Sequence, residues 1–172
     1  MSKETLVRLS ALAAIAGGAL RVVDGLLIPS ASIQVQQFAY FITDLLLLWG
    51  MCGIYLTRSH RLGLAGFIGF VVFWIGIFMV RSSSLSLFGY SAYLIGATVT
   101  LLGAVVLGAD MLVRNAFPRW APVLWIAALL LGILGLRPAW AGWSVMLAGV
   151  IFGLGFIAAG IALLGNVLPG KE

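Results

Sequence analysis

Charge, cysteine and histidine are all scarce in this chain of 172 residues. Only 9% of the residues are charged, against about a quarter in soluble globular domains. The single cysteine, Cys52, excludes an internal disulfide and a thiolate metal cluster. The single histidine, His60, lies in a predicted loop among arginines. The sequence therefore predicts neither a metal site nor a bound cofactor, and the apolar run around Cys52 indicates a packing role for its thiol.

The chain also lacks the sequence motifs of enzymes. It contains no HExxH zinc motif, no GxSxG nucleophile motif and no Gly-rich phosphate loop before a lysine. No glutamate falls inside any predicted membrane span. We therefore expect a protein that is not an enzyme. The net charge of +5 does not predict nucleic-acid binding either, because no soluble module carries a basic face.

Apolar residues are what the chain has in abundance. Hydrophobic residues make up 63% of it and the mean hydropathy is +1.17, values that predict a polytopic membrane protein. Windows of about 20 apolar residues cross the ~30 Å hydrocarbon layer of a bilayer. The sequence predicts an all-α bundle of six transmembrane helices forming one domain over 1–172, with spans near 6–28, 38–56, 62–80, 90–113, 120–136 and 139–164.

The basic residues predict the orientation of these spans. With six spans both termini share a side, and seven lysines and arginines fall on that side, against only Arg81 and Arg137 on the other. The positive-inside rule then places both termini in the cytoplasm and the chain in the inner membrane of a cell. A cleaved signal peptide is the alternative for the first span. Its apolar run continues to Ile28, however, and cleavage would leave five spans and break the charge alternation.

Three charged residues interrupt the first two spans. Arg21 and Asp24 lie near the outer end of the stretch "AAIAGGALRVVDGLLIP", and Asp44 lies at a similar depth in the second span, one turn below Tyr40. A lone charge in hydrocarbon costs at least ~2.5–3.5 kcal/mol, so we expect these groups to converge, with Arg21 pairing one of the carboxylates. The cluster is either a structural salt bridge between two neighbouring helices or an outward-facing site for a small ligand, an ion or a proton.

A second group of charges lies at the predicted cytoplasmic boundary. Arg58, Arg61, Arg114 and Arg119 form this basic rim, and Asp110 precedes Arg114 by four residues, an ordinary helix pair. We expect the rim to set the topology and to contact lipid headgroups, with docking of an acidic partner as the alternative.

Small residues recur on single faces of several spans. In the last span Gly142, Gly149, Gly153 and Gly160 share one face, and similar stripes run along the first and fourth spans. Without a hydrophobic driving force in lipid, small residues let helices approach closely. We expect these faces to meet inside the bundle, although the same spacing also suits a contact between two copies of the chain.

Two stretches, "RNAFPRWAPVLWIAALLLGILG" and "LLLLWGMCGIYLTRSHRLGLAGFIGF", resemble small multi-pass bacterial inner-membrane proteins of families with no assigned function. The resemblance implies a bacterial multi-pass protein and no activity, so it assigns no functional residue. Two functions are consistent with the sequence. One is a non-enzymatic subunit or regulator that acts through contacts with membrane lipids and with a membrane-protein partner or a second copy. The alternative is a small carrier of protons or small solutes that uses Arg21, Asp24 and Asp44.

Overall fold

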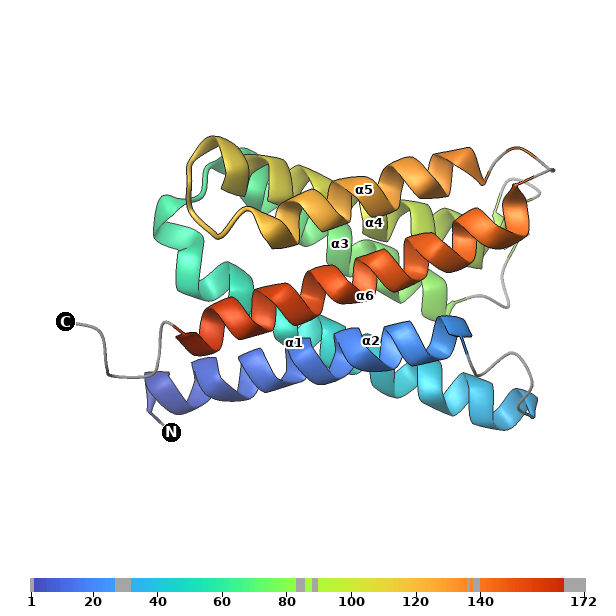
Figure 1. Ribbon diagram of the computed structural model, residues 1–172, viewed down its shortest axis with the longest axis horizontal. Helices are drawn as coiled ribbons and strands as arrows, with labels where there is room; N and C mark the ends of the chain where they lie inside the picture. The colour runs from blue at the N-terminus through green and yellow to red at the C-terminus, as the bar shows by residue number, and fades with distance from the viewer. Residues whose placement is uncertain are drawn as a thin grey trace.

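The structure, a computed structural model, describes residues 2–26, 32–82, 86–87, 90–135, 137 and 140–165. Its architecture is the predicted all-α bundle (Figure 1). The α-helices in the described part are α1 (Lys3–Leu26), α2 (Ile33–Arg58), α3 (Leu64–Arg81), α4 (Ala92–Val113), α5 (Trp120–Leu134) and α6 (Ala141–Gly165). A short 3-10 turn, η2 (Ser59–Arg61), follows α2.

Five of these helices are long and apolar enough to cross a membrane, so the chain is a multi-pass membrane protein. The exception is α5, which has 15 residues and a length of about 22 Å at a rise of ~1.5 Å per residue. Pro118 lies just before it, and Pro122 sits in its first turn, where the missing N–H would have no partner within the helix.

Helix ends differ from the predicted spans by a few residues, most clearly in α2. The polar stretch before the second span was expected to lie outside the helix, but α2 already begins at Ile33. Gln34, Gln36 and Gln37 are helical because glutamine is a good helix former, whereas an apolar window detects only the part of a helix that lies in hydrocarbon. The first span was predicted to reach Ile28, which lies outside the described residues.

A small hairpin takes the place of the predicted start of the fourth span. Strand β1 (Ser86–Leu87) pairs antiparallel with β2 (Tyr90–Ser91), and α4 starts only at Ala92. The prediction that the helix begins at Tyr90 is therefore wrong by two residues.

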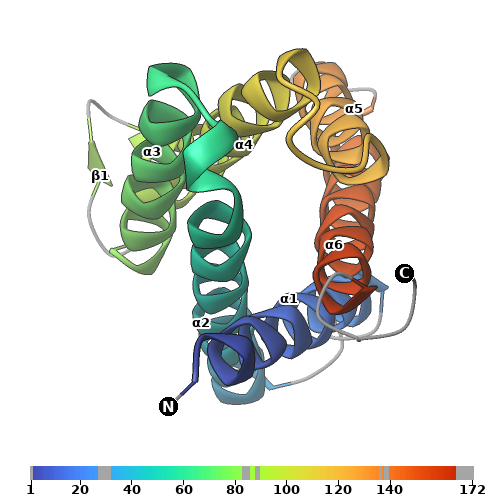
Figure 2. The ribbon, with the colours of Figure 1, turned by 90° about the vertical axis from the view of Figure 1, so that its left-hand side faces the viewer.

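The six helices form a closed ring when viewed along the bundle (Figure 2). Consecutive helices pack against one another, except that α2 touches α3 only lightly, and α6 returns to pack along α1. The first residue of α1 and the last residue of α6 lie at the same end of the bundle, together with η2 and the turn between α4 and α5 (Figure 1). We call this the terminal end; the other is the far end.

Glycines allow close crossings between helices. A Cβ on Gly153 of α6 would lie 2.5 Å from the Gly18 carbonyl oxygen of α1, and the reverse substitution would meet the Gly153 oxygen equally closely. In α4, Gly103 faces the backbone of Phe73 in α3 in the same way. The predicted small faces therefore meet other helices in part: Gly153 packs on α1 and Gly103 on α3, whereas a Cβ on Gly142 of the predicted α6 stripe would meet nothing within 4 Å.

Candidate functional site

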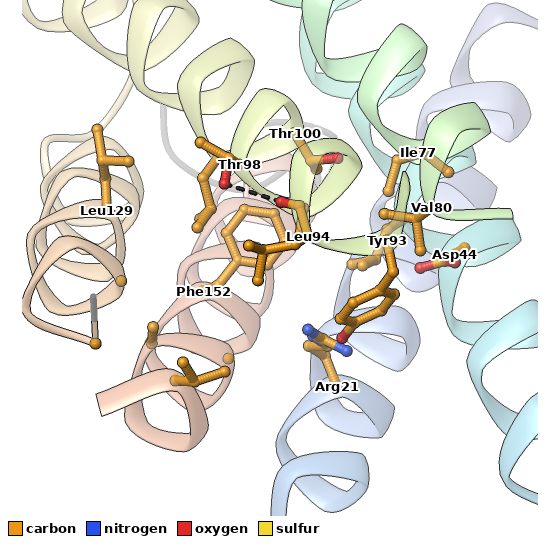
Figure 3. Close-up of a pocket in the computed structure, with 18 of the residues that line it drawn as sticks. Arg21, Asp44, Ile77, Val80, Tyr93, Leu94, Thr98, Thr100, Leu129 and Phe152 are labelled. Carbon is orange, nitrogen blue, oxygen red and sulfur yellow. Dashed lines mark hydrogen bonds between the residues drawn. The ribbon is translucent and has the colours of Figure 1, made fainter. Parts of the chain in front are cut away.

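The ring encloses a cavity of about 230 Å³ in its far half (Figure 3). Residues from all six helices line it, from the last two turns of α1, α3 and α5 and from the first half and middle of α2, α4 and α6. Figure 3 shows Arg21, Asp44 and Tyr93 on one side of it, with Ile77 and Val80 beside Asp44, and Leu129 and Phe152 on the other side. This cavity contains three of the four predicted site residues: Arg21, Tyr40 and Asp44.

The direct partner of Asp44 is Arg81, at the end of α3. Asp44 Oδ2 lies 2.5 Å from Arg81 Nη2, with 12% of the aspartate side chain and 31% of the arginine side chain exposed. The sequence places Arg81 in the outer loop region and predicts Arg21 as the partner of one of the two carboxylates, so it does not predict this pair. The pair joins α2 to α3, two helices that otherwise touch little.

Arg21 lines the same cavity but makes no ion pair with any described residue. It lies within electrostatic range of Asp24 and Asp44 without direct contact. In Figure 3 its guanidinium group and the ring of Tyr93 point toward one another. Tyr40 also lines the cavity, within electrostatic range of both side chains, so two phenol groups and a guanidinium group contribute to its wall.

Asp24, the fourth predicted residue, lies behind the cavity wall. Its residue surface is 1% exposed, and its Oδ2 accepts a hydrogen bond of 2.9 Å from the Thr43 hydroxyl group of α2. Its Oδ1 is buried and has no hydrogen-bond partner among the described residues. The structure thus brings Asp24 near Arg21 as predicted but gives it a neutral partner.

The opposite wall offers almost no hydrogen-bonding groups. Thr98 and Thr100 are the polar side chains there, and each donates its hydroxyl hydrogen to a carbonyl oxygen one turn back in α4, at 2.9 Å and 2.8 Å. A hydroxyl that is bonded to its own helix backbone contributes mostly its methyl group and carbon atoms to a cavity surface. The remaining wall is aliphatic, including Leu94, Leu101 and Leu129.

Toward the terminal end, a layer of aromatic side chains closes the cavity. Phe152 lines the cavity and contacts Phe156 edge to face, with ring centroids 5.2 Å apart. Phe156 also contacts Phe73 at 5.9 Å and Trp125 at 5.3 Å. Phe73, Phe156 and Trp125 are fully buried, so this layer separates the cavity from the terminal end of the bundle.

Sequence reasoning missed three residues of this site: Arg81, Thr43 and Tyr93. Arg81 could have been found from topology, because α3 ends at the same boundary at which α2 begins, and an arginine side chain is long enough to reach Asp44. The sequence gives no comparable signal for Tyr93.

The basic rim lies at the terminal end, as the helix order requires, but its members have different surroundings. Arg114 donates to Asp110 Oδ1 at 2.9 Å, while Asp110 Oδ2 accepts a bond of 2.7 Å from the Gly63 N–H before α3. Arg58 is half-buried over the Phe117 ring, 5.7 Å from its centroid. Arg61 and Arg119 are exposed. The expected pair of Asp110 and Arg114 therefore also holds the start of α3.

No group of three or more metal-ligating side chains occurs among the described residues. Comparison with protein-family models, with curated proteins and with solved structures finds no match to this chain.

Proposed function

We propose that this chain is a non-enzymatic protein of the bacterial inner membrane that binds a small solute in its cavity, taking it up from the outer side. The observation that carries the proposal is the cavity of about 230 Å³ with Arg21, Asp44 and Arg81 in its wall. Ionisable groups inside a membrane are expensive and usually mark a functional site. An aqueous or ligand-filled cavity beside them lowers that cost.

The cavity favours solute binding over the first expectation, a subunit acting only through helix and lipid contacts. Such a subunit gains nothing from an internal space larger than the engineered ~150 Å³ cavity that holds benzene. A purely structural salt bridge likewise needs no third charge, yet Arg21 lies beside the Asp44 and Arg81 pair without an ion-pair partner of its own among the described residues. The aromatic layer around Phe156 supports access from one side only.

Cysteine accessibility tests this proposal. In a Cys52→Ser background, Ala97→Cys introduces a thiol into the cavity wall. A negatively charged, membrane-impermeant thiol reagent added to intact cells should label it. The matched control is Leu130→Cys on α5, whose side chain is 59% exposed on the outer surface of the bundle and should lie in lipid. This control should not react, because a thiol in hydrocarbon does not ionise.

Labelling of Ala97→Cys only after the cells are opened would mean that the cavity opens to the cytoplasm and that the predicted orientation of the chain is wrong. Absence of labelling in both conditions would mean that water does not reach the cavity, and the proposed function would then fail.

A further inference from the structure

The charges that line the cavity do not balance. Two guanidinium groups, of Arg21 and Arg81, face it together with one carboxylate, of Asp44. Asp44 and Arg81 are in direct contact and neutralise each other. Asp24 is not part of the lining and is bonded to Thr43. The cavity surface therefore presents one positive charge, that of Arg21, without a contacting counterion.

The surroundings of Arg21 fit an anion with two acceptor atoms. A guanidinium group presents a fork of N–H donors that matches a carboxylate, and such bidentate pairs are among the strongest hydrogen bonds in proteins. The Arg21 side chain has open space beside it because its neighbour on α6 is a glycine. A Cβ on Gly149 would already lie 3.8 Å from Arg21 Nε and Nη2. The phenol groups of Tyr40 and Tyr93 are the further donors on this side.

The opposite wall of the cavity is complementary to an apolar part of a ligand. Leu94, Leu101 and Leu129 face the cavity there, and the Thr98 hydroxyl is bonded within its own helix. A ligand atom that needs a hydrogen bond would find no partner on this wall and would lose its bonds to water. Hydrocarbon or aromatic carbon is the complementary chemistry.

The size of the cavity limits the ligand. If ~150 Å³ holds the six carbon atoms of benzene, then about 230 Å³ holds roughly nine non-hydrogen atoms. A single excess charge favours a carboxylate over a phosphate monoester, which carries a charge of about −1.5 to −2 at neutral pH.

We infer that the cavity binds an amphipathic carboxylate, with the carboxylate on Arg21 and an apolar body between α4, α5 and α6. This inference rests on the proposed function, because it names the class of solute that the cavity accepts. A short-chain fatty acid and an aromatic carboxylate share this chemistry.

The test uses 4-fluorobenzoate as the probe and 4-fluorobenzamide as its neutral counterpart of the same shape. The purified protein is placed in lipid nanodiscs, and binding is measured by ¹⁹F NMR against empty nanodiscs. We expect the wild type to bind the carboxylate at least tenfold more tightly than the amide. Arg21→Gln should remove that preference and leave amide binding within twofold. Arg21→Lys should keep part of the preference, because it retains the charge but loses the planar fork.

A pair of glycine variants on α6 controls for the position of the ligand. Gly149→Leu fills the space beside Arg21 and should abolish binding of both compounds. Gly142→Leu adds the same bulk to the same helix where a Cβ meets nothing within 4 Å, and it should leave both affinities unchanged.

Equal affinity of the wild type for the two compounds, or an unchanged preference in Arg21→Gln, would overturn the inference. If neither compound binds while Ala97→Cys is labelled from outside, the ligand class is wrong and the proposed function stands. If neither binds and Ala97→Cys is not labelled, both fail.

Discussion

Removing Arg81 should destabilise the bundle much more than removing Arg21, although both are arginines in the wall of one cavity. Arg81→Met leaves Asp44 with its 12% exposed side chain and no contacting cation. Breaking a fully buried pair costs about 3–5 kcal/mol, whereas an exposed pair contributes at most ~1 kcal/mol. Because Arg81 is 31% exposed and Arg21 still attracts Asp44 from a distance, we expect an intermediate loss of roughly 2 kcal/mol.

A double-mutant cycle isolates the contribution of this pair. Asp44→Asn should cost only about 1 kcal/mol, since Arg81 can then turn its charge toward water. The double variant should be about as stable as Asp44→Asn alone, which corresponds to a coupling free energy of about 2 kcal/mol. Arg21→Met should change stability by less than ~0.5 kcal/mol, or increase it, because it removes a charge that has no direct partner.

The assay is equilibrium unfolding in mixed micelles of a mild detergent and sodium dodecyl sulfate, followed by far-ultraviolet circular dichroism. Additive effects of Arg81→Met and Asp44→Asn would show that the two groups do not interact in the folded protein. A loss in Arg21→Met as large as that in Arg81→Met would refute the assignment of Arg81 as the partner of Asp44.

Two further predictions concern helix packing and the terminal end. Gly153→Leu should destabilise the protein by at least ~2 kcal/mol, because its Cβ would meet an α1 carbonyl oxygen at 2.5 Å. The control Gly142→Leu should leave the thermal midpoint of unfolding in detergent unchanged. Equal midpoints for the two variants would mean that this α6 face does not pack on α1. Asp110→Ala removes the acceptor of the Gly63 N–H and should cost about 1–3 kcal/mol, with faster hydrogen exchange at the Gly63 amide. The exposed Arg119→Ala should have no such effect, and an unchanged exchange rate in Asp110→Ala would contradict the capping role.

The helices could be predicted from the sequence because hydrocarbon imposes a length and a composition on anything that crosses it. Their order around the ring could not, because it depends on which small faces meet. The stripe on α6 that includes Gly153 identifies a close contact, but nothing in its spacing says that α1 rather than α4 lies opposite.

The candidate site was predicted in part for a similar reason. Placing Arg21 and Asp44 by depth along their helices brought them to one level, and the structure has both in one cavity. The same reasoning failed to find Arg81, because the depth of each residue was judged from the position of its Cα. The Arg81 side chain extends about a helical turn from its own Cα and so reaches Asp44. It also offered Arg21 as a partner for either Asp24 or Asp44, whereas the structure gives Asp24 the short polar side chain of Thr43.

The closure of the ring by α1 and α6 has a consequence for how the chain is made. Helices enter the membrane in the order of synthesis, so α1 is inserted first and must wait for α6 before Gly18 and Gly153 can meet. Until then Arg21 has one wall of its cavity missing and faces lipid or the insertion machinery. A product that stops before α6 therefore leaves the Arg21 side of the cavity uncovered.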